Sequence, residues 1–329
     1  MFPGFRSCRS PTSSAAISAT TPERRRRPRQ SGRRLQSAMI TWPNFFSQLF
    51  NGLASGTLLA LIASGLTIIY GTLGVLNLAH GSMFMLGGYA GYAAYQATGS
   101  FAVAVAAGAV ALVAVGIVIE LVIIRRFYGR PPEDQLLVTF GIGIVIIELV
   151  RLGFGSLSLT VPAPAFAAGV TRMGFMIYPT YRLVVMGIAT LALGVLYVVL
   201  YRTRLGMIVR AGIEDSAMVD MLGINVFRVF MVVFGIGTMA AGFAGIVDAP
   251  VVSLTPNMGE SILVDTFVVV VIGGVGSFPG AIIGGLIAGE ILSITSMIDP
   301  AYSEVMLFAA MTLVLMLRPQ GLLGVASRE

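Results

Sequence analysis

The sequence predicts an all-α, polytopic transmembrane helical bundle, and three observations support this. Of the 329 residues, 56% are hydrophobic and only 11% are charged, against about 25% charged residues in an average soluble domain. Long apolar segments recur from about residue 45 to the end of the chain. The apolar sequence is interrupted at 70–81 by glycines, an asparagine and the only histidine of the chain. Lipid cannot satisfy free backbone groups there, so this break must pack inside protein or line a cavity.

The chain divides into two parts near residue 38. Residues 1–38 hold nine arginines with many Ser, Thr and Pro residues, and we expect a disordered basic tail held inside the cell by its charge. The arginine run at 24–27 could also indicate a nucleic-acid contact or a targeting signal. We assign this tail no function and expect no nucleic-acid partner. Residues 39–329 form one transmembrane domain.

Nine segments of this domain have the length or the apolarity of membrane spans. They cover about residues 45–69, 82–98, 101–124, 136–152, 182–201, 228–248, 262–276, 280–297 and 303–318. Basic residues mark cytoplasmic loops by the positive-inside rule. The rule places the loops near 125–130 and 202–210, and the C-terminus, in the cytoplasm.

Charge parity then predicts a tenth segment. With nine crossings the basic tail would lie outside the cell, although the positive-inside rule places a segment with nine arginines in the cytoplasm. The conflict disappears if 70–81 is itself a short, broken crossing, which gives about ten membrane segments and two cytoplasmic termini. The loop 153–181 is then external and forms part of an outer vestibule or docking surface, although Arg172 and Arg182 place basic residues on that side.

The polar break supplies the first candidate site. Asn77 and His80 could contact a substrate, but a structural role, hydrogen bonding to carbonyls freed by the broken helix, is favoured because lipid offers no alternative partner. Gly74 and Gly81 are expected to act as hinge or packing residues. The glycine-rich block 273–285 predicts a tight cytoplasmic turn between two closely packed helices.

A second candidate site lies in the segment 202–227, between two spans. Apolar residues recur there at three- to four-residue spacing, which predicts a short amphipathic helix. Glu214 and Asp215 are expected at its N-terminus, where the helix dipole favours anions. Gly223 is expected to end it. Such a helix is too short to span a membrane, and it can lie on the lipid surface or dock in a groove of another protein.

Four acidic residues lie within apolar spans, where an unpaired charge costs about 2.5–3.5 kcal/mol. Glu148 has Arg151 one helical turn away, and Glu120 lies near Arg125, so both are expected to form structural pairs. Asp265 and Glu290 have no evident local partner, and polar anchoring between helices is favoured over substrate contact.

Several kinds of chemistry are excluded. A lone Cys8 cannot form an intrachain disulfide, and with a single histidine it leaves no dedicated zinc site, so no metal or cofactor is expected. The chain has no lysine, because all 21 basic residues are arginines. It therefore lacks a Walker A lysine and cannot itself hydrolyse ATP by that mechanism. We expect no enzymatic activity and no catalytic residue.

Five sequence blocks, in order, resemble the permease subunits of the branched-chain amino acid ABC transporter family, most closely the LivH type. The resemblance covers about residues 45–325 and excludes the basic tail. The blocks are Asn51-Gly52 through Tyr70-Gly71, Asn77-Leu-Ala-His80-Gly81, Ala211 to Asn225, Val271 to Gly285, and Arg318-Pro-Gln-Gly-Leu-Leu-Gly324.

This resemblance implies a function and a set of partners. It implies a bacterial inner-membrane permease, multi-pass in the lipid bilayer, that forms the translocation pathway with a LivM-type permease subunit. Two cytoplasmic ATPase subunits would supply energy, and a periplasmic binding protein would deliver branched-chain or related amino acids. The segment from Ala211 to Asn225 resembles the coupling loop that docks the ATPase. The residues expected to carry coupling are Arg210, Glu214, Asp215, Asp220 and Gly223.

Two other functions remain open at this stage. An ion-coupled secondary transporter of small polar solutes would also carry broken helices and intramembrane acids, and a channel is a third possibility. The short helix near 214–223 distinguishes them, because only an importer driven by a separate ATPase needs a docking element. The sequence does not identify the substrate among branched-chain amino acids, other amino acids, amides, urea and small acids.

Overall fold

A computed structural model describes residues 42–174, 176–214 and 216–324, so the predicted tail 1–38 lies outside the described residues. The described chain is mostly helical, with one small hairpin and several connecting loops. The elements, in chain order, are α1 (Trp42–Leu73), α2 (His80–Thr98), α3 (Phe101–Val122), η1 (Ile124–Phe127), α4 (Pro132–Phe154), β1 (Val170–Met173), β2 (Met176–Pro179), α5 (Thr180–Arg202), α6 (Arg204–Glu214), α7 (Ser216–Met221), α8 (Val226–Asp248), α9 (Met258–Gly273), α10 (Phe278–Ile298), η2 (Pro300–Tyr302) and α11 (Ser303–Leu317).

The predicted polytopic helical bundle is confirmed, whereas the predicted count of about ten membrane segments is not. Seven helical stretches in the described residues are long and apolar enough to cross a membrane. They are α1, α3 with η1, α4, α5, α8, α10, and α11 with η2. Helices α2 and α9, with 19 and 16 residues, fall outside this set.

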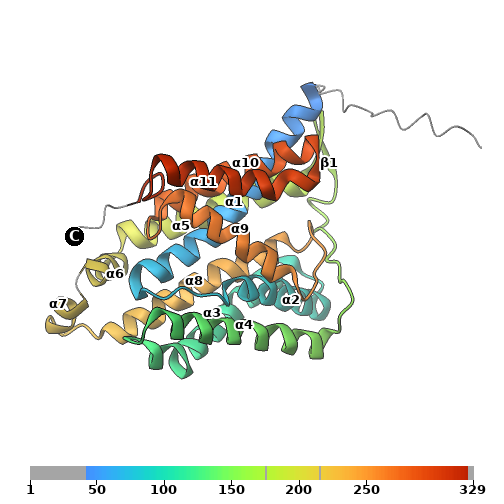
Figure 1. Cartoon of the computed structure of the whole chain (residues 1–329). Helices are drawn as coiled ribbons and strands as arrows, with labels where there is room; N and C mark the ends of the chain where they lie inside the picture. The colour runs from blue at the N-terminus through green and yellow to red at the C-terminus, as the bar shows by residue number, and fades with distance from the viewer. Residues whose placement is uncertain (1–41, 175, 215, 325–329) are drawn as a thin grey trace, which may run out of the picture. The chain divides into compact units, whose positions relative to one another are not determined.

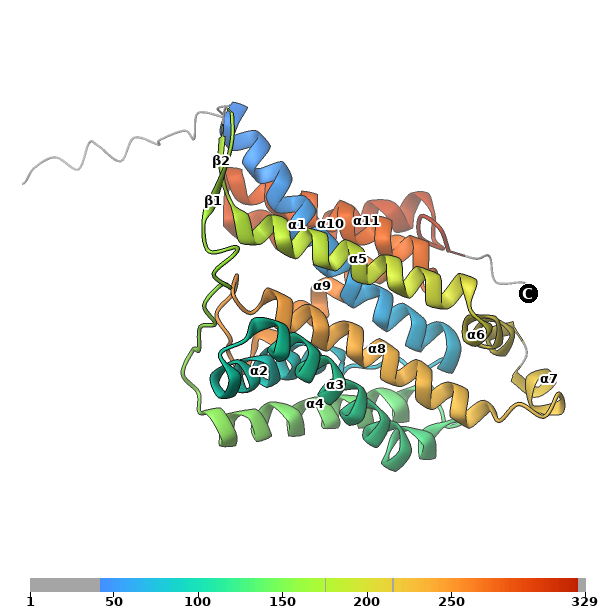
Figure 2. The ribbon, with the colours of Figure 1, turned by 180° about the vertical axis from the view of Figure 1, so that it is seen from behind.

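Helices α1 and α8 hold the described bundle together. Helix α1 packs on α5, α8, α9 and α10, and α8 packs on α1, α2 and α3. Figures 1 and 2 show α5, α10 and α11 on one side of this pair and α2, α3 and α4 on the other. Nearly all of α1 between Ala54 and Ile69 is buried. The longest described helix therefore lies in the core, where it contacts other helices rather than lipid.

Small residues permit the closest helix contacts. Gly289 of α10 lies against the backbone of Gly52 and Gly56 on α1, and Gly87 of α2 lies against Gly242 of α8. A Cβ atom on Gly289 or on Gly87 would overlap the facing backbone. Lipid is as apolar as leucine, so association in a membrane depends on such close packing. The large apolar side chains that remain exposed on α3, α4, α5 and α11 suit contact with acyl chains.

The segment 70–81 does not form a crossing of its own, which corrects the prediction. Tyr70–Leu73 is the last turn of α1, and His80 begins α2, so only 74–79 is non-helical. Gly74 ends α1 at a φ of +68°, and its N–H donates to the carbonyl of Tyr70. Glycine reaches this left-handed conformation without a steric penalty, so α1 ends at Gly74 rather than at Tyr70.

The loop predicted at 153–181 contains an antiparallel hairpin. Strand β1 pairs with β2 in the register Val170 to Pro179 and Met173 to Met176. The start of α1 lies beside this hairpin, since Ser47 contacts Met176. The other end of the bundle holds α6, α7 and the turn between α9 and α10, where Leu322 donates a backbone hydrogen bond to Ile272 (Figure 1). Helices α1 and α11 therefore run from the hairpin end to the α6–α7 end.

The glycine-rich block 273–285 forms a tight turn, as predicted. Helix α9 ends at Gly273, and the Ser277 side chain caps α10 by accepting from the N–H of Gly280. Pro279 lies in the first turn of α10, where its missing N–H costs nothing.

Candidate translocation and coupling elements

The polar break is packed inside the protein. Asn77 and His80 are both completely buried. The His80 Nε2 atom lies 3.0 Å from the carbonyl oxygen of Ile62, in the middle of α1. The Asn77 side-chain oxygen accepts from the N–H of Ala79 at 3.1 Å, so it supports the backbone just before α2. These contacts link the start of α2 to the centre of the bundle.

Gly81 explains why α2 and α9 cross so closely at their starts. A Cβ atom at Gly81 would overlap the carbonyl oxygen of Gly259. Gly74, by contrast, has open space around it, and its positive φ is its only visible requirement for glycine. Asn77 Nδ2 and His80 Nδ1 have no hydrogen-bond partner among the described residues. The structure brings Asn77, His80 and Gly81 together in the packed interior, and none of the three lines either cavity described below.

The coupling segment consists of two short helices instead of one. Glu214 ends α6 and lies two positions before the start of α7, so it is near the N-terminus of the predicted short helix, whereas the preceding helix α6 was not predicted. Asp215 lies outside the described residues. Helicity starts earlier because Arg204–Glu214 is itself strongly amphipathic. Asp220 is exposed on α7. Gly223 follows at a φ of +80°, with its N–H donating to the Asp220 carbonyl at 2.9 Å, so the predicted stop at this glycine is confirmed.

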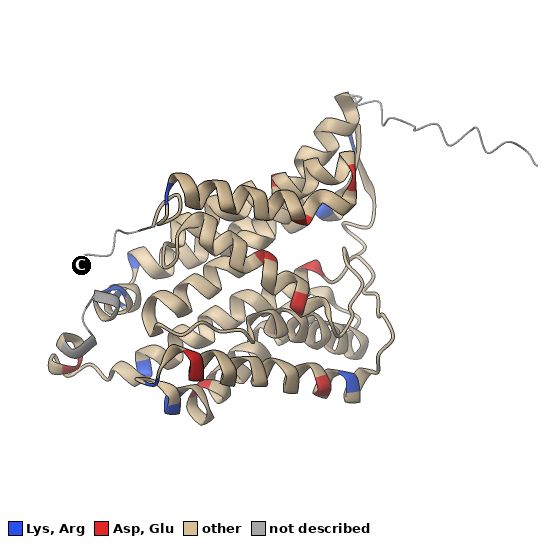
Figure 3. Ribbon diagram, in the orientation of Figure 1, with Lys and Arg blue, Asp and Glu red and all other residues tan. Residues whose placement is uncertain are grey.

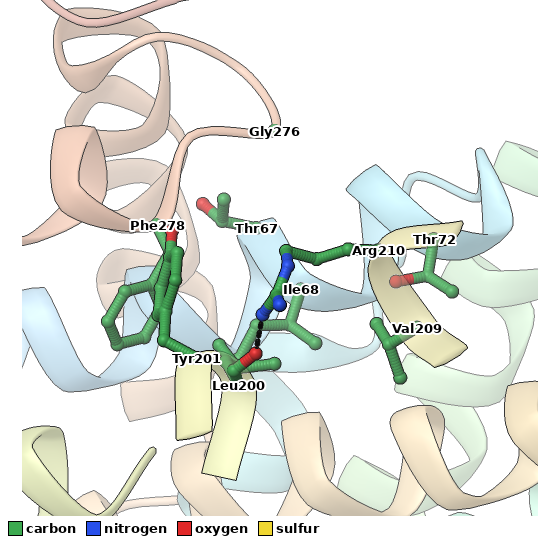
Figure 4. A pocket seen from close by; sticks show the side chains of 9 residues that line it. All are labelled: Thr67, Ile68, Thr72, Leu200, Tyr201, Val209, Arg210, Gly276 and Phe278. Carbon is green, nitrogen blue, oxygen red and sulfur yellow. Dashed lines mark hydrogen bonds between the residues drawn. The ribbon is translucent and has the colours of Figure 1, made fainter. Parts of the chain in front are cut away.

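Arg210 fixes α6 against the bundle. Its guanidinium lies 5.2 Å from the centre of the Tyr201 ring and donates to the carbonyl of Leu200. Figure 4 shows the side chain extending between the end of α5 and the last turns of α1. It lines a cavity of about 220 Å³ together with Thr67, Ile68, Thr72, Leu200, Tyr201, Val209, Gly276 and Phe278. Helix α6 therefore meets α1, α5 and the α9–α10 turn at one place.

Two of the four intramembrane acids form the ion pairs predicted for them. Glu120 is completely buried and lies 3.0 Å from the Arg125 guanidinium. Tyr128 donates to the same carboxylate at 3.1 Å, and burial, aided by the negative charge of Glu120, raises the pKa of Tyr128. Glu148 pairs with Arg151 at 2.5 Å. Both carboxylates therefore take part in the structural pairs that the sequence predicted.

The other two acids have different environments. The carboxylate of Glu290 is buried against Gly52, and neither oxygen has a hydrogen-bond partner in the described part of the chain. Asp265 lines a second cavity, of about 330 Å³, between the hairpin-side halves of the helices; we call it the outer cavity. Its lining residues are Ala54, Ser55, Leu58, Leu59, Ile62, Arg182, Val185, Asp248, Val251, Val252, Ile262, Asp265 and Leu292.

Sequence reasoning missed two residues of the outer cavity. Arg182 counted only as a basic residue on the external side, and Asp248 received no attention. The sequence does show that both residues lie at the ends of apolar segments, because Arg182 begins one such segment and Asp248 ends another. A charge at the end of a span can face either water or a cavity. Only the packing of α5 against α1 and α8 reveals that these two face the same cavity.

An apolar helical bundle with a buried polar link between α1 and α2, a cavity lined by charged side chains and an amphipathic element between two spans is typical of a polytopic membrane transport protein. A family model described as "Branched-chain amino acid transport system / permease component" matches residues 48–315. The chain belongs to this family. The family describes a permease component, so membership does not favour the ion-coupled secondary transporter.

Individual relatives agree with this family. The chain is 33% identical to the high-affinity branched-chain amino acid transport system permease protein LivH of Escherichia coli K12, over 85% of this chain and 96% of that protein. It is 30% identical to the corresponding permease BraD of Pseudomonas aeruginosa, with the same coverage. The ribose import permease RbsC of Escherichia coli K12 is 28% identical over 75% of this chain and 78% of its own length. No solved structure matches.

Proposed function

We propose that this chain is the membrane-spanning permease subunit of an ATP-binding cassette importer for branched-chain or related amino acids. The family match over residues 48–315 carries the proposal. The LivH and BraD relatives are named for branched-chain amino acid transport, and both are covered almost end to end. The ribose permease shows that a similar chain is named for a different solute.

The proposal includes partners that supply energy and substrate. A homologous LivM-type permease subunit completes the pathway, two cytoplasmic ATPases hydrolyse ATP, and a periplasmic binding protein delivers the solute to the bacterial inner membrane. The absence of lysine supports ATP hydrolysis by separate subunits, because a P-loop needs a lysine that contacts the β- and γ-phosphates. Helices α6 and α7, between two spans, offer the docking element for an ATPase.

Arg210 connects this docking element to the bundle. A shift of α6 would move the guanidinium that reaches the end of α5, and it would alter the cavity shared with α1 and with Gly276 and Phe278 of the α9–α10 turn. Packed elements respond to such shifts by moving as rigid bodies. In this proposal, conformational changes of the ATPase reach the bundle through five residues of this segment: Arg210, Glu214, Asp215, Asp220 and Gly223.

The broken segment has a supporting role in the proposal. Asn77, His80 and Gly81 keep α2 and α9 in register with α1, and Gly74 supplies the bend. A rigid junction at this place lets the two halves of the bundle move as units. Complete burial of Asn77 and His80 supports this role over direct contact with a solute.

For the topology, we propose that the α6–α7 end faces the cytoplasm. Figure 3 shows how basic residues concentrate toward the ends of the bundle. Most of the described arginines belong to the α6–α7 end: Arg125, Arg126, Arg130, Arg202, Arg204, Arg210, Arg228 and Arg318. Only Arg151, Arg172 and Arg182 of the described arginines belong to the hairpin end. This asymmetry supports a cytoplasmic α6–α7 end by the positive-inside rule.

The sequence-based proposal of about ten segments with both termini cytoplasmic remains to be tested. The opposed ends of α1 and α11 favour an odd number of crossings between Trp42 and Arg318 instead. Cysteines at Ser31 and Ser327, in a Cys8→Ser background, address the two termini directly. Protection of both from an impermeant label in intact cells would support ten segments.

Reconstitution tests the function. The chain, its permease partner and the ATPases are placed in liposomes, with ATP inside and the binding protein plus radiolabelled leucine outside. We expect uptake that needs ATP hydrolysis and the binding protein, and that competing valine and isoleucine reduce. Uptake driven by a proton or sodium gradient without the ATPases would instead support a secondary transporter. Competition by ribose but not by valine would redirect the substrate assignment.

A further inference from the structure

The outer cavity has the size of a small-molecule site. Its volume of about 330 Å³ is at the lower end of the range of about 300–1,000 Å³ found for ligand pockets. Five helices or their ends contribute to its wall: α1, α5, α8, α9 and α10. Ser55 of α1 is exposed and lines the cavity, so a reagent can reach it there.

One basic and two acidic side chains line this cavity without a direct ion pair. Arg182 comes from the first turn of α5, Asp248 from the last turn of α8, and Asp265 from α9. None of the three takes part in an ion pair within 4.0 Å among residues 42–174, 176–214 and 216–324. Charges at membrane depth are costly, so they usually pair or line an aqueous route. Acidic and basic side chains that line one cavity without direct contact suit a ligand that carries both charges.

Arg182 is oriented by its neighbours yet keeps donors to spare. Its guanidinium donates to the side-chain oxygen of Asn51, and the same oxygen accepts from the Tyr178 hydroxyl. The Tyr178 hydroxyl also lies within hydrogen-bonding reach of this guanidinium. A guanidinium carries five N–H groups, so donors remain after these two contacts. A planar guanidinium with free N–H groups suits two parallel hydrogen bonds to a carboxylate.

The negative side of the cavity suits an ammonium group. Asp248 and Asp265 approach from different helices, and Glu304 of α11 adds a further negative charge near Asp265. The remaining wall is aliphatic and comprises Leu58, Leu59, Ile62, Val185, Val251, Val252, Ile262 and Leu292. The cavity therefore presents a carboxylate-binding group, ammonium-binding groups and an apolar surface for a branched side chain.

We propose that the outer cavity is a transit subsite for a zwitterionic aliphatic amino acid. Arg182 binds the α-carboxylate, Asp248 binds the α-ammonium group with Asp265 reinforcing the negative field, and the aliphatic wall holds the side chain. The inference rests on the proposed import of amino acids and adds residues that no family name or relative supplies. A transit subsite binds weakly, since solute must leave it toward the cytoplasm.

Protection of an introduced cysteine measures occupancy directly. The Ser55→Cys variant, made in the full-length Cys8→Ser chain and assembled with its partner subunits, is treated with N-ethylmaleimide. We expect millimolar leucine to slow the modification in the absence of the binding protein. Isoamylamine lacks the carboxylate and isocaproate lacks the ammonium group, so each should protect roughly tenfold less effectively, in line with the loss of a charge-assisted contact.

Charge-removing variants then identify the groups. Arg182→Gln should lower protection by leucine roughly tenfold and should let isoamylamine protect as well as leucine. Asp248→Asn should likewise lower protection by leucine roughly tenfold, and it should let isocaproate protect as well as leucine. Arg172→Gln and Asp299→Asn are matched controls outside the cavity, and they should leave protection by leucine unchanged.

The outcomes separate the subsite from the function. Equal protection by leucine, isoamylamine and isocaproate, or unaltered selectivity in both cavity variants, would overturn the subsite while ATP-dependent uptake by the assembled transporter stays intact. Absence of ATP-dependent leucine uptake by the unmodified transporter would instead overturn the proposed function. If a cavity variant does not assemble, the Ser55→Cys variant alone still tests the subsite, through the comparison of protection by leucine, isoamylamine and isocaproate.

Discussion

His80 joins two helices through one hydrogen bond in the centre of the bundle. Water cannot replace a lost hydrogen-bond partner of a polar group there, so losing such a partner lowers the stability of the fold. The sequence identified His80 and Asn77 as exceptional because they interrupt an apolar segment, and it favoured a structural role. It could not name Ile62 as the partner, because that contact depends on how α2 packs against α1.

Substitution of His80 should destabilise the fold. We expect His80→Ala to lower the free energy of unfolding by roughly 2–4 kcal/mol, because both the packing of the ring and the contact with the Ile62 carbonyl are lost. His80→Gln keeps an N–H donor and should cost less. Thermal unfolding in detergent, followed by circular dichroism, measures this. The exposed Gln96 serves as a control through Gln96→Ala, and an equal effect in both alanine variants would contradict the role of His80.

Two glycines provide a matched pair for the close crossing of α2 and α9. Gly81→Ala should destabilise by roughly 1–3 kcal/mol, because the new methyl group meets the Gly259 carbonyl oxygen. Gly141→Ala places the same methyl group in open space on α4, and it should be neutral or stabilise by up to about 1 kcal/mol. The same thermal assay compares them. Similar losses in both variants would show that close packing at Gly81 is unimportant.

At the scale of elements, periodicity identified the helices better than their ends. The predicted span 45–69 corresponds to α1, which continues to Leu73 because Gly74 supplies the first left-handed residue. The coupling segment differs more, since α6 already begins at Arg204. A local pattern does not reveal that Arg210 anchors α6 on Tyr201 of the preceding helix. The hairpin β1–β2 was also missed, because two four-residue strands leave little alternation to detect.

The end of α7 offers a test of coupling. Gly223→Pro is incompatible with a φ of +80° and removes the N–H that bonds to Asp220. We expect leucine uptake by the reconstituted transporter to fall roughly tenfold while ATP hydrolysis and membrane insertion persist, because α7 would no longer dock in register. Asp215→Arg, which reverses a charge in the same segment, should also uncouple.

Gly212→Ala is the control for this test, since it adds a methyl group to α6 in open space. It should transport normally. Coupled transport at the normal rate in both Gly223→Pro and Asp215→Arg would show that this segment does not dock the ATPase.

At the scale of the whole molecule, composition was sufficient for the fold class but not for the number of crossings. The count of ten rested on the charge of the tail and on a separate crossing at 70–81. That segment instead divides between the end of α1, a non-helical link at 74–79 and the start of α2. The outer cavity was also beyond reach, because Arg182 and Asp248 lie 66 positions apart and meet only through tertiary packing.

The orientation of α1 gives the last prediction. Helix α1 is buried between α5, α8 and α10 and starts beside the hairpin, so reversing it would dismantle the core. Single cysteines replacing Asn44 and Ser156, both exposed at the hairpin end, should react with an impermeant maleimide in intact cells. A cysteine at Asp220, exposed on α7, should react only after the membrane is opened. Protection of Asn44→Cys together with Asp220→Cys would instead mean that α1 enters from the cytoplasm, and it would restore the ten-segment count.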